Sequence, residues 1–142
     1  MNVAQILKDK GHSVVVDRPD TSIGDVVRHL AAKSIGAIVI VDDGDGVAGI
    51  VSERDVMRAI AEHGGSCLEQ PVANIMTQDV VSCRAQDSVN DIMGMMTAGR
   101  FRHIPVVDGE RLIGLISIGD VVKNHIAEIE LEASALRSYV SG

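Results

Sequence analysis

The sequence is almost without aromatic residues, since its 142 residues include one Phe, one Tyr and no Trp. Proteins that bind single-stranded nucleic acid stack the bases on such rings, so this function is disfavoured. The chain also lacks a surplus of positive charge: 13 Lys and Arg against 20 Asp and Glu give a net charge of −7. A protein that binds the phosphate backbone needs a basic surface. The composition therefore predicts that nucleic acid is not a partner.

Long apolar runs and paired cysteines are missing as well. No apolar run approaches the roughly 20 residues that cross a bilayer, and the first residues show no signal-peptide pattern. The two cysteines, Cys67 and Cys83, form no Cys-x-x-Cys pair, which favours reduced thiols. His12, His29 and His125 have no metal-ligand spacing to cysteines or carboxylates. We therefore expect a cytoplasmic protein with no membrane association and no bound metal.

What the chain does contain is an internal repeat. The segment Gly-Ile-Val-Ser-Glu-Arg-Asp at residues 49–55 returns as Gly-Leu-Ile-Ser-Ile-Gly-Asp at residues 114–120, an offset of 65 (114 − 49). At an offset of 66, residues 35–42 fall on residues 101–108. One extra residue in the Asp-Gly loop at 43–46 accounts for the difference, and surface loops tolerate insertions. The chain is therefore a tandem duplication.

Each copy is predicted to fold as strand, helix, strand, strand, helix, because β-branched runs, helix-cap residues and Gly-rich turns recur in that order. In the first copy the strands are expected at 14–16, 37–41 and 47–51. One helix should follow the cap candidates at 20–22, and the other should span 53–63. In the second copy they are expected at 80–81, 89–98, 103–107 and 112–116, followed by a long final helix. The pattern predicts an α+β fold with helices covering one side of a sheet. We divide the chain into a first unit with an N-terminal segment (1–68), a second unit (69–126) and a helical tail (127–142).

The Ser-x-x-Asp part of the repeated motif lies where a strand is expected to open into a helix. Ser52 and Ser117 are N-cap candidates, and Asp55 and Asp120 would fall at the third helical position. One interpretation is structural, because both side chains can satisfy free N–H groups of the first turn, as in a capping box. The other is functional, because a helix N-terminus attracts phosphate and a carboxylate accepts hydrogen bonds from both hydroxyls of a ribose. Finding the motif at equivalent points of a duplicated unit favours the second interpretation and indicates a nucleotide.

Two units that each end in Gly, two apolar residues and Ser-x-x-Asp resemble a tandem pair of cystathionine-β-synthase (CBS) domains, also called a Bateman module. The resemblance covers about residues 12–126 and extends to short bacterial proteins that consist only of such a pair. It implies two βαββα units packed sheet to sheet about a pseudo-twofold axis, with two clefts between them. In the family these clefts bind AMP, ADP, ATP, S-adenosylmethionine or NAD(H). The motif aspartate holds the ribose, the serine lies near the ribose or phosphate, and main-chain groups of the first and second strands enclose the adenine.

Carried onto this sequence, the resemblance implies one cleft at Ser117 and Asp120 and another at Ser52 and Asp55. The Asp120 cleft would be lined by Val14, Val15, Ile35, Gly36, Arg102 and His103. The Asp55 cleft would be lined by Gly36, Ala37, Thr77, Val80, Val81 and Phe101. The adenine would then have mostly aliphatic surroundings, in keeping with a chain so poor in aromatic residues.

The two expected clefts differ in charge. Gly36 and Ala37 stand where the second copy has Arg102 and His103, so the clefts cannot be equally basic. Arg binds phosphate through a planar fork of donors, and His titrates near neutrality, so we expect this pair to contact phosphate and not merely to face solvent at the start of a strand. Arg54 is left open between a second phosphate ligand and a charge on the helix surface.

These observations predict a regulatory protein, not an enzyme, that senses the energy or redox state of the cell by binding an adenine nucleotide. AMP is the first candidate, with ATP or NAD(H) as alternatives. The ligand would close the clefts, and the changed surface would report to an effector protein that the sequence does not identify. Two other classes stay open. One is an enzyme acting on a nucleotide, although no Ser-His-Asp, Cys-His or phosphate-loop arrangement is discernible. The other is a ligand-free dimerisation scaffold in which the motif aspartates only cap helices.

The last helix carries a heptad stripe of apolar residues spaced 4, 3, 4, 3 and 4 apart. Its members are Val122, Ile126, Ile129, Ala133, Leu136 and Val140. The stripe is too short for a secure isolated coiled coil, so it must cover its apolar side elsewhere. It could dock on its own domain, but the resemblance favours a second copy, because paired CBS domains commonly associate through their end helices. We therefore expect a homodimer, with Glu128, Glu130 and Glu132 facing water.

Overall fold

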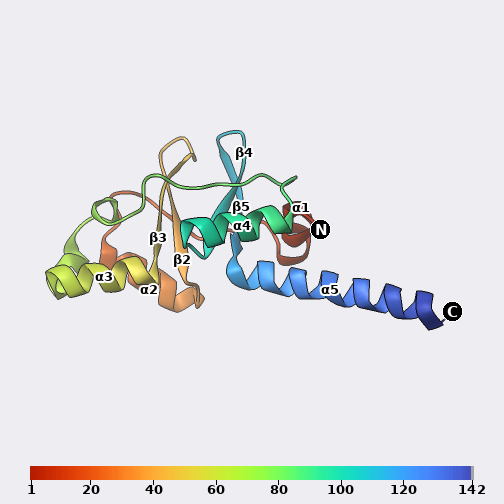
Figure 1. Cartoon of the computed structure of the whole chain (residues 1–142). Helices are drawn as coiled ribbons and strands as arrows, with labels where there is room; N and C mark the ends of the chain where they lie inside the picture. The colour runs from red at the N-terminus through yellow and green to blue at the C-terminus, as the bar shows by residue number, and fades with distance from the viewer. Residues whose placement is uncertain (142) are drawn as a thin grey trace.

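The computed structural model describes the backbone of residues 1–141, which contains five α-helices and five strands (Figure 1). The helices are α1 (Val3–Lys10), α2 (Ile23–Lys33), α3 (Glu53–His63), α4 (Val89–Gly99) and α5 (Ile118–Ser141). The strands are β1 (Val16–Asp17), β2 (Ala37–Val41), β3 (Val47–Ser52), β4 (His103–Asp108) and β5 (Arg111–Ser117). Two short 3-10 turns, Gly65–Glu69 and Val72–Asn74, follow α3. The predicted α+β class, the two central hairpins and the long final helix are confirmed.

The strands form two small sheets, one in each half of the chain. In the first sheet, β1 runs parallel to β2, and β2 pairs antiparallel with β3. In the second, β4 pairs antiparallel with β5. The hairpins β2–β3 and β4–β5 point in the same direction in Figure 1. The duplication seen in the sequence is therefore repeated in the backbone.

The first strand of each copy is shorter than predicted. Of the residues expected at 14–16, only Val16 belongs to β1, so Val14 and Val15 lie outside the sheet. The strand expected at 80–81 is absent from the described backbone. Its place is taken by a single parallel bridge from Cys83 to Val106, the counterpart at an offset of 66 of the β1 pair Asp17 and Ile40 (83 − 17 and 106 − 40). In both copies the backbone pairs with the neighbouring hairpin strand slightly later in the chain than the β-branched residues predict. The β-branched residues alone therefore did not determine where these strands form.

Each half has its own buried core. In the first half, β2 is buried along its whole length, as a strand with apolar residues on both faces should be. It packs with the apolar face of α2, in which Ile23, Val26 and Leu30 are buried as predicted. In the second half, Ile104 and Ile116 of the hairpin pack with Ile92 and Met96 of α4. Each hairpin therefore packs with helices in a core of its own.

Helix α1 was not predicted and packs on the second half. Its buried side chains Val3, Ile6 and Leu7 belong to the same cluster as the second hairpin and α4. Asn2 and Gln5 form a capping box that starts the helix. Chain order places α1 in the first unit (1–68), whereas its contacts lie with the second. The chain thus begins by crossing to the other half of the molecule.

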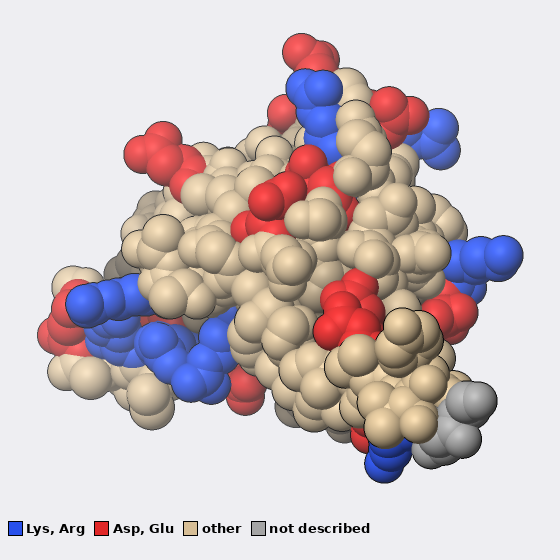
Figure 2. All heavy atoms as spheres, turned by 45° about the vertical axis from the view of Figure 1, so that its right-hand side comes forward, with Lys and Arg blue, Asp and Glu red and all other residues tan. Residues whose placement is uncertain are grey.

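Helix α5 begins on the body of the protein and then extends away from it (Figure 1). Val121 is fully buried in the second core, and the first turns contact α4 and β5. Most of the heptad stripe is uncovered, with Val122, Ile126 and Ile129 about half exposed at 46%, 50% and 51%. Docking of the stripe on its own domain is therefore not observed among the described residues. Figure 2, which brings the α5 side forward, shows charged side chains of both signs separated by broad uncharged areas.

Candidate functional site

The first Ser-x-x-Asp motif forms a closed set of hydrogen bonds at the junction of β3 and α3. Ser52 ends the strand and is the N-cap of the helix, and its Oγ accepts from the backbone N of Asp55 at 3.3 Å. In return, Oδ2 of Asp55 accepts from the backbone N of Ser52 at 2.9 Å and from its Oγ at 3.1 Å. The predicted capping role is confirmed for this motif.

The second motif repeats this geometry at the junction of β5 and α5. Oδ2 of Asp120 accepts from the backbone N of Ser117 at 2.9 Å and from its Oγ at 3.0 Å, and Ser117 Oγ accepts from the backbone N of Asp120 at 3.2 Å. Within residues 1–141, no intramolecular hydrogen bond reaches Oδ1 of Asp55 or of Asp120. Each carboxylate is therefore fixed by one oxygen, and the cap does not use the other.

Two other Ser-x-x-Asp segments in the chain lack this arrangement. Ser22 and Ser88 are the N-caps of α2 and α4, and each accepts from the backbone N of the aspartate three residues later, Asp25 or Asp91. Neither of these carboxylates turns back to its cap: Asp25 pairs with Arg28, and Asp91 is exposed. The reciprocal bond is thus specific to the two motifs that follow the hairpins.

Lys10, which the sequence analysis did not single out, lies at the second motif. Its Nζ donates to Oδ2 of Asp120 at 2.6 Å and to the backbone O of Leu115 at 2.8 Å. Burial raises the pKa of the Asp120 carboxyl, but hydrogen bonds from Lys10 and Ser117 and the lysine charge outweigh it and hold the pKa below its usual value. No ion pair joins Asp55 to a basic side chain within residues 1–141. The internal repeat could have pointed to Lys10 as a site residue. At an offset of 66, Lys10 aligns with Met76 (76 − 66), which directly precedes Thr77, the residue that pairs with β3.

His103 lies between the two motifs. In the β4–β5 ladder it stands opposite Ser117. A β-carbon at Gly36, in the other half, would lie 3.4 Å from Cε1 of His103 and 2.9 Å from Oε1 of Glu53. Burial lowers the pKa of His103, the charges of Lys10 and Arg102 lower it further, and those of Glu53 and Asp120 oppose them. The neutral imidazole is therefore favoured at the meeting point of both halves.

The backbone around the two motifs follows the same symmetry. The carbonyl of Gly36 accepts from the backbone N of Glu53 at 3.0 Å, and the carbonyl of Arg102 accepts from that of Ile118 at 2.8 Å. Ala37 stands opposite Ser52 in the first hairpin, just as His103 stands opposite Ser117 in the second. In each hairpin, the start of the first strand therefore lies beside the motif at the end of the second strand.

The structure distributes the remaining predicted site residues around this region. Thr77 is exposed and pairs with Ile50 of β3 through two backbone hydrogen bonds of 3.0 and 2.9 Å. Some of the other residues are partly buried (Val14, Val15, Ile35, Val80 and Phe101), and the rest are exposed (Arg54, Val81 and Arg102). Val15 and Ile35 pack on the first core and Phe101 on the second. Their roles in the two clefts stay predictions.

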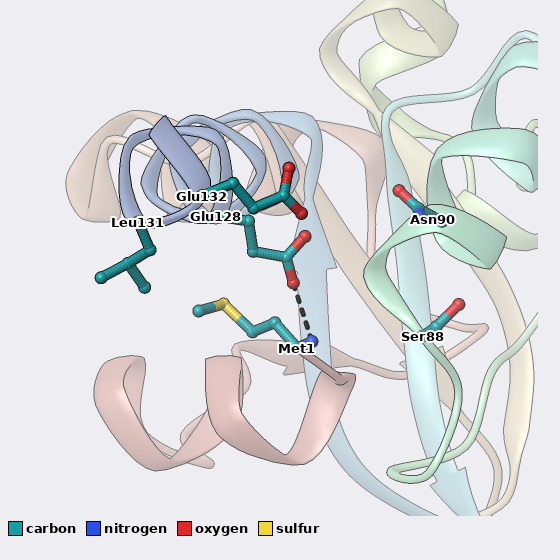
Figure 3. A pocket seen from close by; sticks show the side chains of 6 residues that line it. All are labelled: Met1, Ser88, Asn90, Glu128, Leu131 and Glu132. Atoms are coloured by element: carbon teal, nitrogen blue, oxygen red, sulfur yellow. Dashed lines mark ion pairs between the residues drawn. The ribbon is translucent and has the colours of Figure 1, made fainter. Parts of the chain in front are cut away.

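A hollow of about 410 Å³ lies away from both motifs, between α5 and the start of α4 (Figure 3). Ser88, Asn90, Leu131 and Glu132 line it together with the N-terminal amine, which pairs with Glu128 at 2.7 Å. The expectation that Glu128 faces water is therefore wrong, because this pair keeps its side chain only 26% exposed. The hollow contains neither motif aspartate.

Two chemical features are not found in the described part of the chain. Residues 1–141 contain no group of three or more His, Cys, Asp or Glu side chains that could hold a metal ion. None of their helices is long and apolar enough to cross a membrane.

Both halves of the chain match a known protein family. The sequence profile of the CBS domain matches this chain twice, at residues 3–62 and 72–126. The chain belongs to the CBS domain family. The two profile matches correspond to the two halves that carry the Ser-x-x-Asp motifs, and the expected pair of CBS units is confirmed.

Relatives of known name and structure agree with this membership. The chain is similar to the mitochondrial CBS domain-containing protein CBSX3 of Arabidopsis thaliana, with 33% identity over 99% of this chain and 72% of the relative. It is also similar to the crystal structure of a CBS-domain-containing protein from Agrobacterium tumefaciens, with 45% identity, a TM-score of 0.85 and coverage of 88% of this chain and 99% of the other. A CBS domain protein from Pyrobaculum aerophilum, solved in complex with AMP, has 25% identity, a TM-score of 0.76 and coverage of 84% and 89%.

Proposed function

We propose that this CBS-pair protein is a regulatory module that binds an adenine nucleotide through Asp55 and Asp120 and so senses the energy or redox state of the cell. One observation carries the proposal: in both motifs the capping serine fixes Oδ2 of the aspartate, and no donor within residues 1–141 reaches Oδ1. A carboxylate held in this way accepts hydrogen bonds from ribose hydroxyls without first changing its rotamer, which lowers the cost of binding. The same pattern occurs twice, so we propose two related sites.

AMP is the ligand that we propose first, with ATP or NAD(H) as alternatives. The structure of the Pyrobaculum aerophilum relative is a complex with AMP, and its fold matches that of this chain with a TM-score of 0.76. The adenine would lie among aliphatic side chains and strand backbone in the Asp55 cleft, where Ala37 stands opposite Ser52 and Thr77 pairs with β3. In the Asp120 cleft, the exposed Arg102 supplies a fork of donors for phosphate.

The experiment is calorimetric titration of AMP into the parent protein and into the variants Asp55→Ala, Asp120→Ala and the double variant. Loss of a charged acceptor for the ribose should cost about 1.5–3 kcal/mol, or roughly ten- to a hundredfold in affinity, at the altered site. Asp91→Ala is the matched control, because it removes an aspartate from the same position of a Ser-capped helix outside the motifs. If the folded double variant binds AMP as well as the parent does, the ribose assignment is wrong.

The same samples separate the three classes of function. Thermal stabilisation by AMP, ATP or NADH without turnover supports a regulatory module. Turnover of the nucleotide supports an enzyme, and the absence of any shift supports a scaffold in which the aspartates only cap helices. We favour the regulatory module because the relatives compared above are named for their CBS domains and not for a reaction.

We further propose that the protein is a homodimer that contacts an effector protein in the cytoplasm. The uncovered stripe on α5 supports the dimer: Val122 and Ile126, with Ile118, line a shallow apolar hollow of about 660 Å³ along this helix. Burial of such side chains is the usual driving force of association.

A further inference from the structure

The two motifs differ in what covers the strand beside them. In the first half, the carbonyl of Ile50 accepts from the backbone N of Thr77 at 2.9 Å. The equivalent carbonyl in the second half is that of Leu115 (115 − 50 = 65), and it accepts from the Nζ of Lys10 at 2.8 Å. One edge is thus closed by backbone and the other by a charged, movable side chain.

Lys10 reaches the motif aspartate as well as this carbonyl. The distance from its Nζ to Oδ2 of Asp120 is 2.6 Å, and the lysine side chain is 36% exposed. Oδ2 then has three donors, namely Lys10 and the N and Oγ of Ser117. The equivalent oxygen of Asp55 has two donors, both from Ser52, and an uncharged Met76 aligns with Lys10 in the repeat (76 − 66 = 10).

We propose that Lys10 makes the Asp120 site selective for adenine nucleotides that carry an anionic phosphate over uncharged nucleosides. This inference rests on the proposed function of Asp120. The ammonium ion of Lys10 lies 2.6 Å from Oδ2 and occupies one approach to the Asp120 carboxylate, so a ribose that contacts both carboxylate oxygens must displace the lysine. A neutral nucleoside offers the displaced ammonium ion no new partner. A nucleotide offers it a phosphate oxygen, and the flexible four-carbon stem of lysine lets the charge move from the carboxylate to the phosphate.

Two other basic residues stand near this exchange, Arg102 and His103. Arg102 is exposed and adds a second cation, whereas His103 favours its neutral form beside Lys10. In the described part of the chain no lysine pairs with Asp55, and the aligned Met76 is packed against Gly49 of β3. The Asp55 site therefore accepts nucleoside and nucleotide with a smaller difference in affinity.

The test compares adenosine with AMP by calorimetry in an Asp55→Ala background, which isolates the Asp120 site. With Lys10 present, AMP should bind at least about tenfold more tightly than adenosine. In Lys10→Met, the affinity for AMP should fall about tenfold and that for adenosine should stay or rise, so the ratio collapses. Lys10→Arg should keep the preference. Lys8→Met is the matched control, because it removes an exposed lysine from the same last turn of α1.

The outcomes separate this inference from the proposed function. Equal weakening of both ligands in Lys10→Met, with AMP still preferred, would assign Lys10 a purely structural ion pair and overturn the inference. The same conclusion follows if AMP binds the parent but not the Asp55→Ala background, because the Asp120 site would then be closed. Failure of AMP to bind even the parent would overturn the proposed function, and the inference with it. Lys10→Gln, compared by thermal melting, provides a second neutral variant should Lys10→Met prove unstable.

Discussion

At the scale of single residues, the two motif aspartates show that a helix cap is compatible with the binding role that we propose. A capping box needs only one carboxylate oxygen, and in both motifs the serine uses only Oδ2. The structural and the functional interpretations of the motif therefore do not exclude each other. Asp55 and Asp120 cap their helices, and the same bonds orient the carboxylates for the ligand that we propose.

His103 predicts how stability depends on pH. Its folded pKa is lowered, chiefly by burial and then by Lys10 and Arg102, whereas an unfolded histidine titrates at about 6.5. As the pH falls through that value, the unfolded state binds the proton first, so the free energy of unfolding should decrease between about pH 7.5 and 5.5. Asp120 does not contribute in this window, because its lowered pKa makes its stabilisation disappear only below its unfolded value of 3.8.

The measurement is chemical denaturation of the parent and of His103→Gln at several pH values in this range. The variant should lose the part of the slope that comes from His103. His63→Gln, in which an exposed histidine near the end of α3 is removed, controls for the loss of one imidazole. If the free energy of unfolding depends on pH equally in the parent and in His103→Gln, His103 is not the group that causes the loss of stability.

At the scale of elements, each half is crossed by a segment that arrives from elsewhere in the chain. The segment with Met76 and Thr77 crosses β3 at Gly49, and α1 crosses β5 at Gly114 through Leu7. A glycine at each crossing lets the incoming segment approach closely. The two glycines are the first residues of the repeated motif, so this part of the motif serves packing and the Ser-x-x-Asp part serves the site.

Gly49→Ala should destabilise the protein by about 1–3 kcal/mol, the usual cost of overpacking. The added β-carbon would lie 2.6 Å from Sδ of Met76 and 2.9 Å from the backbone O of Thr77, which is held by hydrogen bonds to Ile50. Urea denaturation measures the loss. Gly94→Ala in α4 is the control, since its β-carbon meets nothing within 4 Å and should stabilise the helix by about 0.5–1 kcal/mol. A Gly49→Ala variant as stable as the parent would show that the crossing segment can move away.

At the scale of the whole molecule, α1 and α5 link the two ends of the chain. The N-terminal amine pairs with Glu128, and the backbone of Val3 donates to Asp87 O at 2.9 Å, next to the start of α4. The segments that carry Lys10 and Asp120 therefore lie on one body with the projecting helix α5. A change at Asp120 has a direct physical route to the surface that we propose for assembly.

The double variant Ile126→Asp/Ile129→Asp should convert a dimeric parent into a monomer, because two buried charges would oppose association. Light scattering coupled to size-exclusion chromatography measures the mass of each. Leu131→Asp is the control: this residue is 66% exposed on the same helix but lies off the stripe. A monomeric parent would contradict the homodimer, and a dimeric double variant would place the interface elsewhere.

Local physics explains what the sequence alone predicted. Repeated glycine, apolar, Ser-x-x-Asp segments revealed the duplication, and the continuous apolar run of β2 and the caps of α2 and α3 located those elements to within a residue or two. These signals depend on burial and on hydrogen bonds between residues close together in the sequence, so they can be read from the sequence directly. The strand expected at 80–81 failed for the opposite reason, since strand pairing is set by the partner strand and here involves Cys83.

The tertiary structure decided which of the similar sequence segments became the proposed site. Four Ser-x-x-Asp segments cap helices, but only Asp55 and Asp120 return a hydrogen bond to their serines, because only these two follow a hairpin strand whose end fixes the cap. The ion pair of Lys10 with Asp120 joins residues 110 positions apart (120 − 10). No local pattern encodes such a contact: it exists because α1 buries Val3, Ile6 and Leu7 in the second core and so carries Lys10 to the motif.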